Sequence, residues 1–373
     1  MKKSLYIFIM LVFAFVACNN QFDESPNGKI IKNDYAKGFE ISEISEGYII
    51  KIKDRLNNPN QTYNYLLSSK NDFLSANTEI IQIPVSKVVC LSTTHCAFIT
   101  QIDKASTIKG VSGANYVFND ELRSKIQLGE IAEIGYDSHI NLEKIISLNP
   151  DVVFAYGVDN SSIAGYEKLR VIGIPIIFVS DFLENTPLGR MEWIKFFACF
   201  FDNLDYANEY FDSVKNNYNN IKENIVLSGK SSPEIILNLP WKGTWWVPGA
   251  DSYMVKFIKD AGGTYNMTDK KDYESVALTV EEIFAVSKNI DFWLNPNAIT
   301  KKSEILNIEP RLVNFTPVND ARIFNNNKRL NIYGGNDFFE SGITHPDIIL
   351  KDLYHIFYGI DSCYNFYYYQ EIN

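Results

Sequence analysis

The stretch from Met191 to Leu227 contains neither glycine nor proline, and this most constrains the fold. Apolar residues recur along it at steps of three and four, which predicts an amphipathic helical segment. These residues are Phe197, Phe201, Leu204, Ala207, Phe211, Val214, Tyr218, Ile221 and Ile225. A continuous helix here would extend roughly 50 Å at about 1.5 Å per residue, although Asp202 and Asn203 can divide it into a shorter and a longer helix. We therefore expect a stiff connection between two folded parts.

Strand-like and helical patterns alternate on both sides of this stretch. The first series contains VVCLS, INLEKIISLNPDVVFAY and IPIIFVS, and the second contains EIILNLP, SYMVKFIKDAGG, LTVEEIFAVSKNIDFWLNP and RLNIYGG. This alternation predicts α/β layers with largely parallel sheets. Asn141 can cap a helix in the first series, and Thr279 with Glu282 forms a capping box in the second. The matching pattern indicates two lobes of related build.

The N-terminus has the layout of a secretory signal, with Lys2 and Lys3 ahead of an apolar run that ends at Ala17. Ala17 before Cys18 resembles a bacterial lipobox, in which the cysteine is acylated. An ordinary cleaved signal is the alternative. We therefore expect a signal peptide at 1–17, a lipidated Cys18, and a polar tether over 18–30.

The charge of the chain limits its partners. The formal net charge is -10, and removal of the signal would move it to about -12. An acidic chain argues against nucleic acid as a partner. It also requires local positive charge wherever an anionic ligand binds.

Several segments carry a resemblance to a known family. They are VVCLSTTHCAFI, IKGVSGANYV, GEIAEIGYDSHINLEKIISLNPDVVFAYG, EWIKFF, FIKDAGGTYN and GGNDFFESGITHPDIILKDL, in that order. In these segments the chain resembles the periplasmic binding proteins for iron complexes and cobalamin, the helical-backbone class of ABC importer receptors, in their lipoprotein form. The resemblance covers most of Val88 to Ile360.

The resemblance implies an α/β fold with two Rossmann-like lobes joined by a long rigid backbone helix. It places a β-rich N-terminal extension at 31–84, the first lobe at 85–188, the helical connection at 189–228 and the second lobe at 229–373. It also implies an exported protein, anchored to the membrane by its N-terminal lipid and facing the periplasm. We expect a monomer.

In this family the ligand lies between the lobes, at the carboxyl ends of strands. Carried over position by position, the first-lobe candidates are Thr94, His95, Asn115, Tyr116, Tyr136 and Tyr156, with Thr93 and Asp137 beside them. The second-lobe candidates are Trp241, Trp245, Trp246, Asp337 and Phe338, with Asn336 and Phe339 beside them. Alternation along a strand predicts that Trp245 and Trp246 do not both face the cleft.

The residue types suggest the kind of ligand. Aromatic faces suit a flat ring system, which favours cobalamin or heme. A ferric siderophore comes next, because a site for such an anionic complex would be expected to contain several arginines and the arginines of this chain form no motif. His95 either supplies an axial nitrogen to the metal of such a ligand or packs at the start of the first helix. The metal would belong to the ligand, and we expect no resident cofactor.

The resemblance also implies docking to an importer permease and its ATPase through a surface glutamate on each lobe. Glu130 or Glu133 lies in the matching region of the first lobe. In the second lobe Lys259 takes the expected position, which leaves Asp260 as the substitute.

Two other functions remain open at this stage. One is a lipid-anchored capture protein that is not coupled to an importer, and the other is an uncharacterised enzyme on the same fold. The chain contains no G-x-S-x-G, Walker or H-E-x-x-H motif, so we expect a binding protein rather than an enzyme.

Overall fold

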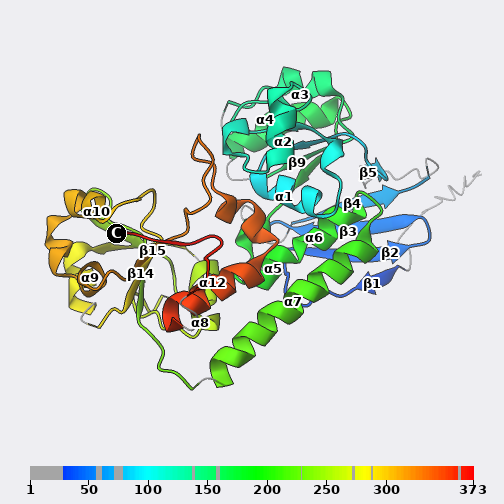
Figure 1. The fold of residues 1–373 in the computed structure, drawn as a ribbon. Coiled ribbons are helices and arrows are strands. Elements are labelled where there is room, and N and C mark those ends of the chain that lie inside the picture. The colour runs from blue at the N-terminus through cyan, green and yellow to red at the C-terminus, as the bar shows by residue number, and fades with distance from the viewer. Residues whose placement is uncertain are drawn as a thin grey trace, which may run out of the picture.

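The computed structural model describes residues 28–55, 61–70, 79–136, 139–156, 160–227, 229–270, 274–286, 289–359 and 363–373. It shows two α/β lobes and an N-terminal sheet, connected by helices that run beneath both lobes (Figure 1). The predicted signal peptide, Cys18 and Asp137 lie outside the described residues. Within the described ranges, no helix combines the length and the apolar character that a membrane span requires.

The N-terminal extension is a five-stranded sheet in the order β1-β2-β3-β4-β5. Its strands are β1 (Lys29–Ile31), β2 (Phe39–Ile44), β3 (Gly47–Lys53), β4 (Thr62–Ser68) and β5 (Glu79–Gln82). Period-two alternation buries Phe39 and Ile41 on one face, and the ring of Phe39 lies 4.8 Å from that of Trp193. The first strand begins at Lys29, so the last two residues of the predicted tether belong to the sheet.

The first lobe contains a parallel sheet in the order β10-β9-β6-β7-β8. Its strands are β6 (Val88–Cys90), β7 (Ile108–Val111), β8 (Ala132–Glu133), β9 (Val152–Ala155) and β10 (Ile176–Phe178). Its helices are α1 (Thr93–Gln101), α2 (Asp120–Gln127), α3 (Leu142–Leu148) and α4 (Asn160–Val171). Asn141 caps α3 as predicted, because its Oδ1 accepts a hydrogen bond from Lys144 N at 2.9 Å.

The second lobe contains a sheet in the order β11-β14-β15-β16, in which only β16 is antiparallel, and a separate β12-β13 pair. Its strands are β11 (Ile235–Leu237), β12 (Thr244–Val247), β13 (Val276–Thr279), β14 (Phe292–Leu294), β15 (Ile323–Asn325) and β16 (Gln370–Glu371). Its helices are α8 (Tyr253–Asp260), α9 (Val280–Val286), α10 (Lys302–Ile308), α11 (Thr316–Asn319) and α12 (Pro346–Tyr358). The predicted capping box is present, since Thr279 N donates to Glu282 and Glu282 N donates to Thr279 Oγ1.

The connection consists of α5 (Pro187–Met191), α6 (Trp193–Cys199) and α7 (Leu204–Leu227). It is interrupted before Leu204, where Asp202 adopts a left-handed backbone with φ of 51°. Helix α7 extends about 36 Å at 1.5 Å per residue, and it packs along α12 of the second lobe (Figure 1). Helix α6 packs against α1 of the first lobe, so the connection is part of both lobe cores.

Candidate ligand-binding cleft

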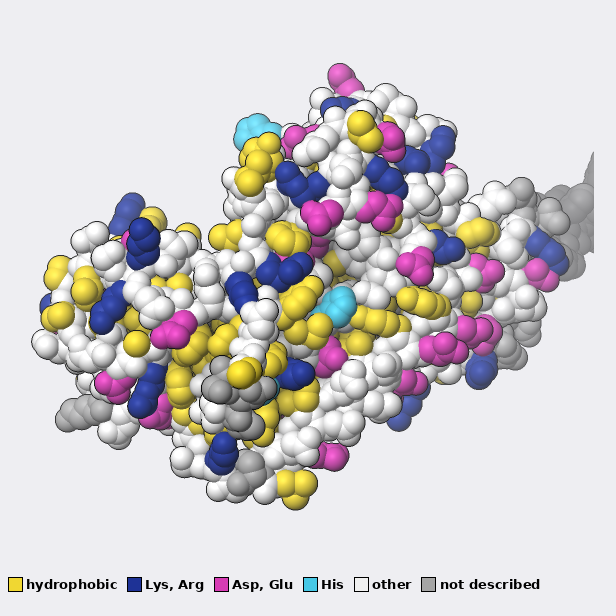
Figure 2. Space-filling model, viewed as in Figure 1, with side chains coloured by type: hydrophobic (Ala, Val, Ile, Leu, Met, Phe, Trp, Pro, Cys, Tyr) yellow, Lys and Arg dark blue, Asp and Glu magenta, His cyan; other side chains and the backbone are white. Residues whose placement is uncertain are grey.

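Two cavities lie between the lobes, with volumes of about 550 and 480 Å³. Both are lined by Ser92, Thr93, Thr94 and Arg190, so they form one continuous cleft. The space-filling view shows a notch between the lobes (Figure 2).

The first-lobe part of the cleft, here the tyrosine cavity, is lined by the residues that follow the strands of the first sheet. Its further lining residues are Leu91, Ser112, Tyr116, Tyr136, Tyr156, Asp181 and Phe182. The rings of Tyr116 and Tyr136 are 5.1 Å apart, and both side chains are about half exposed. Gly113 permits this arrangement, because a Cβ there would lie 2.7 Å from Tyr136 Cδ2 and the backbone has a φ of 62°. The tyrosine pair thus presents aromatic surface with two hydroxyl groups.

The second-lobe part, here the asparagine cavity, is lined by five asparagines together with Pro248, Tyr253, Met254, Phe338, Phe339 and Ile343. The asparagines are Asn238, Asn295, Asn297, Asn326 and Asn336. Asn238, Asn295 and Asn326 directly follow β11, β14 and β15. Asn238, Asn295 and Asn297 have positive φ angles, a conformation that asparagine tolerates and that is concentrated at functional sites.

Arg190 forms the floor that the two cavities share. Its Nε donates to Glu184 O at 3.0 Å, its Nη2 donates to Phe182 O at 2.8 Å, and its guanidinium lies 3.9 Å from the centre of the Tyr253 ring. Asp181 is buried beside it. Burial raises the pKa of Asp181 to about 6, although the Arg190 charge and the Thr94 hydroxyl act in the opposite direction.

The structure brings eight of the predicted cleft residues into the lining, namely Thr93, Thr94, Tyr116, Tyr136, Tyr156, Asn336, Phe338 and Phe339. Asn115, Trp241 and Trp246 are exposed but do not line these two cavities. Arg190, Asp181 and four of the five asparagines were not predicted. Three of these asparagines, Asn238, Asn295 and Asn326, could have been found from the sequence, because each directly follows a short buried strand.

Of the two alternatives for His95, the structure supports packing in the core, and the side chain is not placed to supply an axial nitrogen. His95 is completely buried, and its ring packs 5.6 Å from that of Phe197 and 6.4 Å from that of Phe154. On α1 it shares a face with Phe98 and Ile99, because residues three and four positions apart lie on the same side of a helix. Its side chain therefore faces the core of the first lobe.

Three further predicted site residues are also buried away from the cleft. Trp245 is fully buried and its Nε1 donates to Leu237 O at 2.9 Å, whereas Trp246 is about half exposed, as strand alternation predicts. Asp337 accepts a hydrogen bond from Arg329 Nε at 2.6 Å. Asp260 is only 6% exposed and is paired with two lysines and with the Tyr218 hydroxyl, so it is not available to dock a permease.

We expect replacement of His95 by leucine to leave ligand affinity unchanged and to improve acid tolerance. Burial lowers the pKa of His95 to about 3, whereas the unfolded chain takes up this proton near pH 6.5. The stability contribution of the neutral ring is therefore present above pH 6.5 and is lost as the pH falls, by about 2 kcal/mol at pH 5. Denaturant unfolding at pH 7.5 and pH 5 measures the difference. Equal acid sensitivity in both proteins would contradict this placement.

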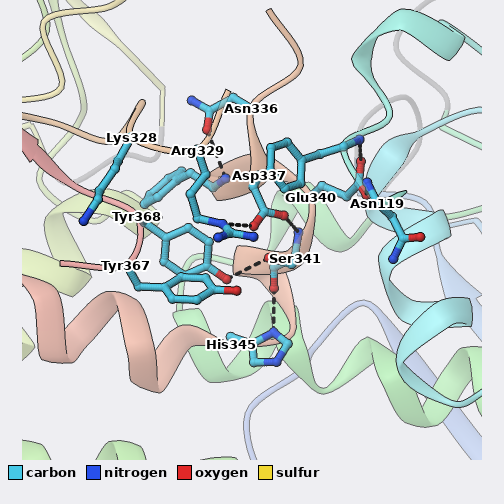
Figure 3. Close-up of polar contacts among 12 residues, drawn as sticks. Asn119, Lys328, Arg329, Asn336, Asp337, Glu340, Ser341, His345, Tyr367 and Tyr368 are labelled. Carbon is cyan, nitrogen blue, oxygen red and sulfur yellow. Dashed lines mark hydrogen bonds and ion pairs between the residues drawn. The ribbon is translucent and has the colours of Figure 1, made fainter. Parts of the chain in front are cut away.

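A loop of the second lobe bridges the cleft to the first lobe (Figure 3). Glu340 accepts hydrogen bonds from Phe118 N at 2.7 Å and Asn119 N at 2.8 Å, at the start of α2. Asn331 Nδ2 donates to Asn115 O and Val117 O, each at 2.9 Å. These contacts, here the inter-lobe bridge, join the lobes independently of the helical connection.

The inter-lobe bridge is expected to depend on pH through Glu340. Burial raises the pKa of Glu340 to about 7, Asp337 adds to the increase, and the two backbone N–H groups and Arg123 oppose it. Between about pH 4.5 and 7 the folded state therefore holds a proton that the unfolded state has lost. The contribution of this group to stability falls as the pH rises through that range, by about 2 kcal/mol from pH 4.5 to 6.

Replacement of Glu340 by glutamine tests this dependence, because the amide keeps the shape of the side chain and does not titrate. We expect the unfolding free energy of the E340Q variant to change less with pH over this interval than that of the original protein. Parallel pH curves for the two proteins would show that Glu340 titrates normally.

The fold and the cleft define a bilobed solute-binding protein. A family model described as "Periplasmic binding protein" matches residues 88–323, and the chain belongs to this family. An uncharacterized lipoprotein of Methanocaldococcus jannaschii is 28% identical over 308 residues, covering 78% of this chain and 71% of the relative. A second uncharacterized lipoprotein of that organism is 27% identical over 268 residues, covering 66% and 65%.

Solved structures share the fold at lower identity. A periplasmic binding protein of Veillonella parvula has a TM-score of 0.61 at 13% identity, covering 84% of this chain and 99% of its own. A periplasmic heme binding protein of Pseudomonas aeruginosa has a TM-score of 0.59 at 14% identity, covering 78% and 98%. The periplasmic vitamin B12 binding protein of Vibrio cholerae has a TM-score of 0.53 at 14% identity, covering 74% and 97%.

Proposed function

We propose that this chain is the solute-binding lipoprotein of an ABC importer and that it carries a bulky metal complex in the cleft between its lobes. The observation that carries the proposal is the continuous cleft itself, which residues at the carboxyl ends of strands in both lobes line together. Cavities of about 550 and 480 Å³ that share four residues suit one large ligand better than a small ion. We propose that such a metal complex is a transported ligand rather than a resident cofactor.

The relatives support this class of ligand. Proteins with the same fold are described as binding heme in Pseudomonas aeruginosa and vitamin B12 in Vibrio cholerae. A further structure from Vibrio cholerae is described as a siderophore binding protein with bound Fe3+-Desferal. We extend to this chain the shared property, which is capture of a large metal complex.

The membrane anchor is the second part of the proposal. Cys18 is the candidate acylation site, and two relatives of this chain are named as lipoproteins. Lipid attached there would hold the monomeric protein at the outer surface of the membrane, beside the importer.

Docking to the permease is proposed for the first lobe only. Glu130 and Glu133 are exposed, at the end of the α2 segment and in β8. Because Asp260 is buried among lysines, the second lobe would use another group.

Membrane capture distinguishes a receptor from a capture protein without an importer. The ligand-loaded protein should retain the permease and its ATPase from detergent-solubilised membranes and should stimulate ATP hydrolysis by that complex. Changing Glu130 and Glu133 together to lysine should reduce both effects, whereas the same change at exposed Glu281, in the second lobe, should not. Retention of ligand without any retention of a permease would support the capture protein instead. Chemical turnover of a bound ligand would support an enzyme.

A further inference from the structure

The cleft carries almost no net charge. Among the described residues that line its two cavities, Arg190 and Asp181 are the ones with a formal charge at neutral pH. With a pKa of about 6, Asp181 is mostly ionised at pH 7 and balances the arginine.

A multiply charged anion would be poorly stabilised in this cleft. Burial of a carboxylate is costly unless a cation or several hydrogen-bond donors compensate it. Arg190 already directs its Nε and one Nη to backbone carbonyl groups. At most one anionic group of a ligand could reach it, and Asp181 would oppose that group.

The asparagine cavity instead offers neutral hydrogen-bonding groups. An asparagine side chain has both a donor and an acceptor, so it can pair with amide, carbonyl or hydroxyl groups.

We propose that the cleft selects an electrically neutral metal complex whose periphery carries amide, carbonyl or hydroxyl groups. This inference rests on the proposed function and narrows its ligand. Two kinds of complex have this chemistry: a corrinoid with amide side chains and a neutral iron(III) trishydroxamate. Heme with its two propionates and a trianionic iron(III) triscatecholate do not have it.

Calorimetric titration of the full-length chain in detergent tests the inference with four probes. They are cyanocobalamin, a neutral iron(III) trishydroxamate, heme and an iron(III) triscatecholate. We expect at least one neutral complex to bind one-to-one, with a Kd roughly 100-fold below those of heme and the triscatecholate. The neutral complex that binds more tightly identifies the ligand as a corrinoid or as a trishydroxamate.

The Asp181→Asn variant tests the role of charge directly, because it changes the net charge of the residues that line the cleft from zero to plus one. We expect it to raise the ratio of heme affinity to corrinoid or trishydroxamate affinity by roughly tenfold. The matched Asp320→Asn variant, at an exposed ion pair in the second lobe, should leave this ratio unchanged.

The titration distinguishes an error in the neutral-ligand inference from an error in the proposed receptor function. Tighter binding of heme or the triscatecholate than of both neutral complexes would overturn the neutral-ligand inference and leave the metal-complex receptor standing. Binding of none of the four probes would count against the proposed function itself.

Discussion

Replacing Glu192 by alanine is expected to lower the free energy of unfolding by about 3–5 kcal/mol. The Glu192 carboxylate is fully buried and accepts hydrogen bonds from the backbone N–H groups of Asp34, Tyr35 and Ala36, at 2.7 to 2.9 Å. Its Oε1 also lies 2.9 Å from the buried Lys195 Nζ. Alanine would leave three donors and one cation without their acceptor.

A second carboxylate, that of Glu184, binds the next two residues of the same segment. Glu184 Oε1 accepts hydrogen bonds from Lys37 N at 2.8 Å and Gly38 N at 2.7 Å. Together the two glutamates hold the segment that leads into β2, and so they fix the N-terminal sheet to the connection between the lobes. This attachment gives the extension a structural role.

Guanidinium unfolding followed by circular dichroism measures the effect of the Glu192 substitution. The matched control is Glu281→Ala, because Glu281 forms an exposed, solvent-screened ion pair with Arg311 whose loss should change stability little. If both substitutions changed the unfolding free energy by the same small amount, the buried carboxylate would not hold the extension.

Replacing Thr94 by tryptophan is expected to weaken ligand binding by roughly 100-fold or more. Thr94 lies in the first turn of α1 and lines both cavities, with its Oγ1 3.0 Å from Ser92 Oγ. An indole at this position would occupy the space that the two cavities share. Core packing should change little, because Thr94 is only partly buried.

The control for this blocking substitution is Lys168→Trp, which adds the same indole to an exposed position of α4 outside the cleft lining. Titration of both variants with the tightest ligand of the original protein gives the comparison, and thermal unfolding verifies that both are folded. Unchanged affinity in the Thr94 variant would place the ligand outside the cleft.

Local patterns in the sequence predicted much of the fold. Asn141 and Thr279 cap the helices they were expected to cap, because a cap depends on residues only three positions away. Trp245 and Trp246 face opposite sides because period two is a property of any strand. The break near Asp202 was expected from Asp202 and Asn203 themselves, although the apolar stripe continues across it at Phe201 and Leu204.

The site was less predictable because it depends on distant contacts. Arg190 lies in the cleft because α5 packs against α6 of the connection and against α8 and α12 of the second lobe, and no local motif marks it. The three backbone donors that Glu192 binds are more than 150 positions away in the sequence. His95 shares one face of α1 with Phe98 and Ile99, which explains why core packing, one of its two alternatives, is the one observed.

A crystal structure of the full-length chain with its tightest-binding metal complex tests the central claim most directly. We expect one ligand between the lobes, in contact with Thr94 and Arg190 in the floor, Tyr116 on one side and Phe338 on the other. A ligand bound on the N-terminal sheet or on the outer face of a lobe, with the cleft empty, would contradict it.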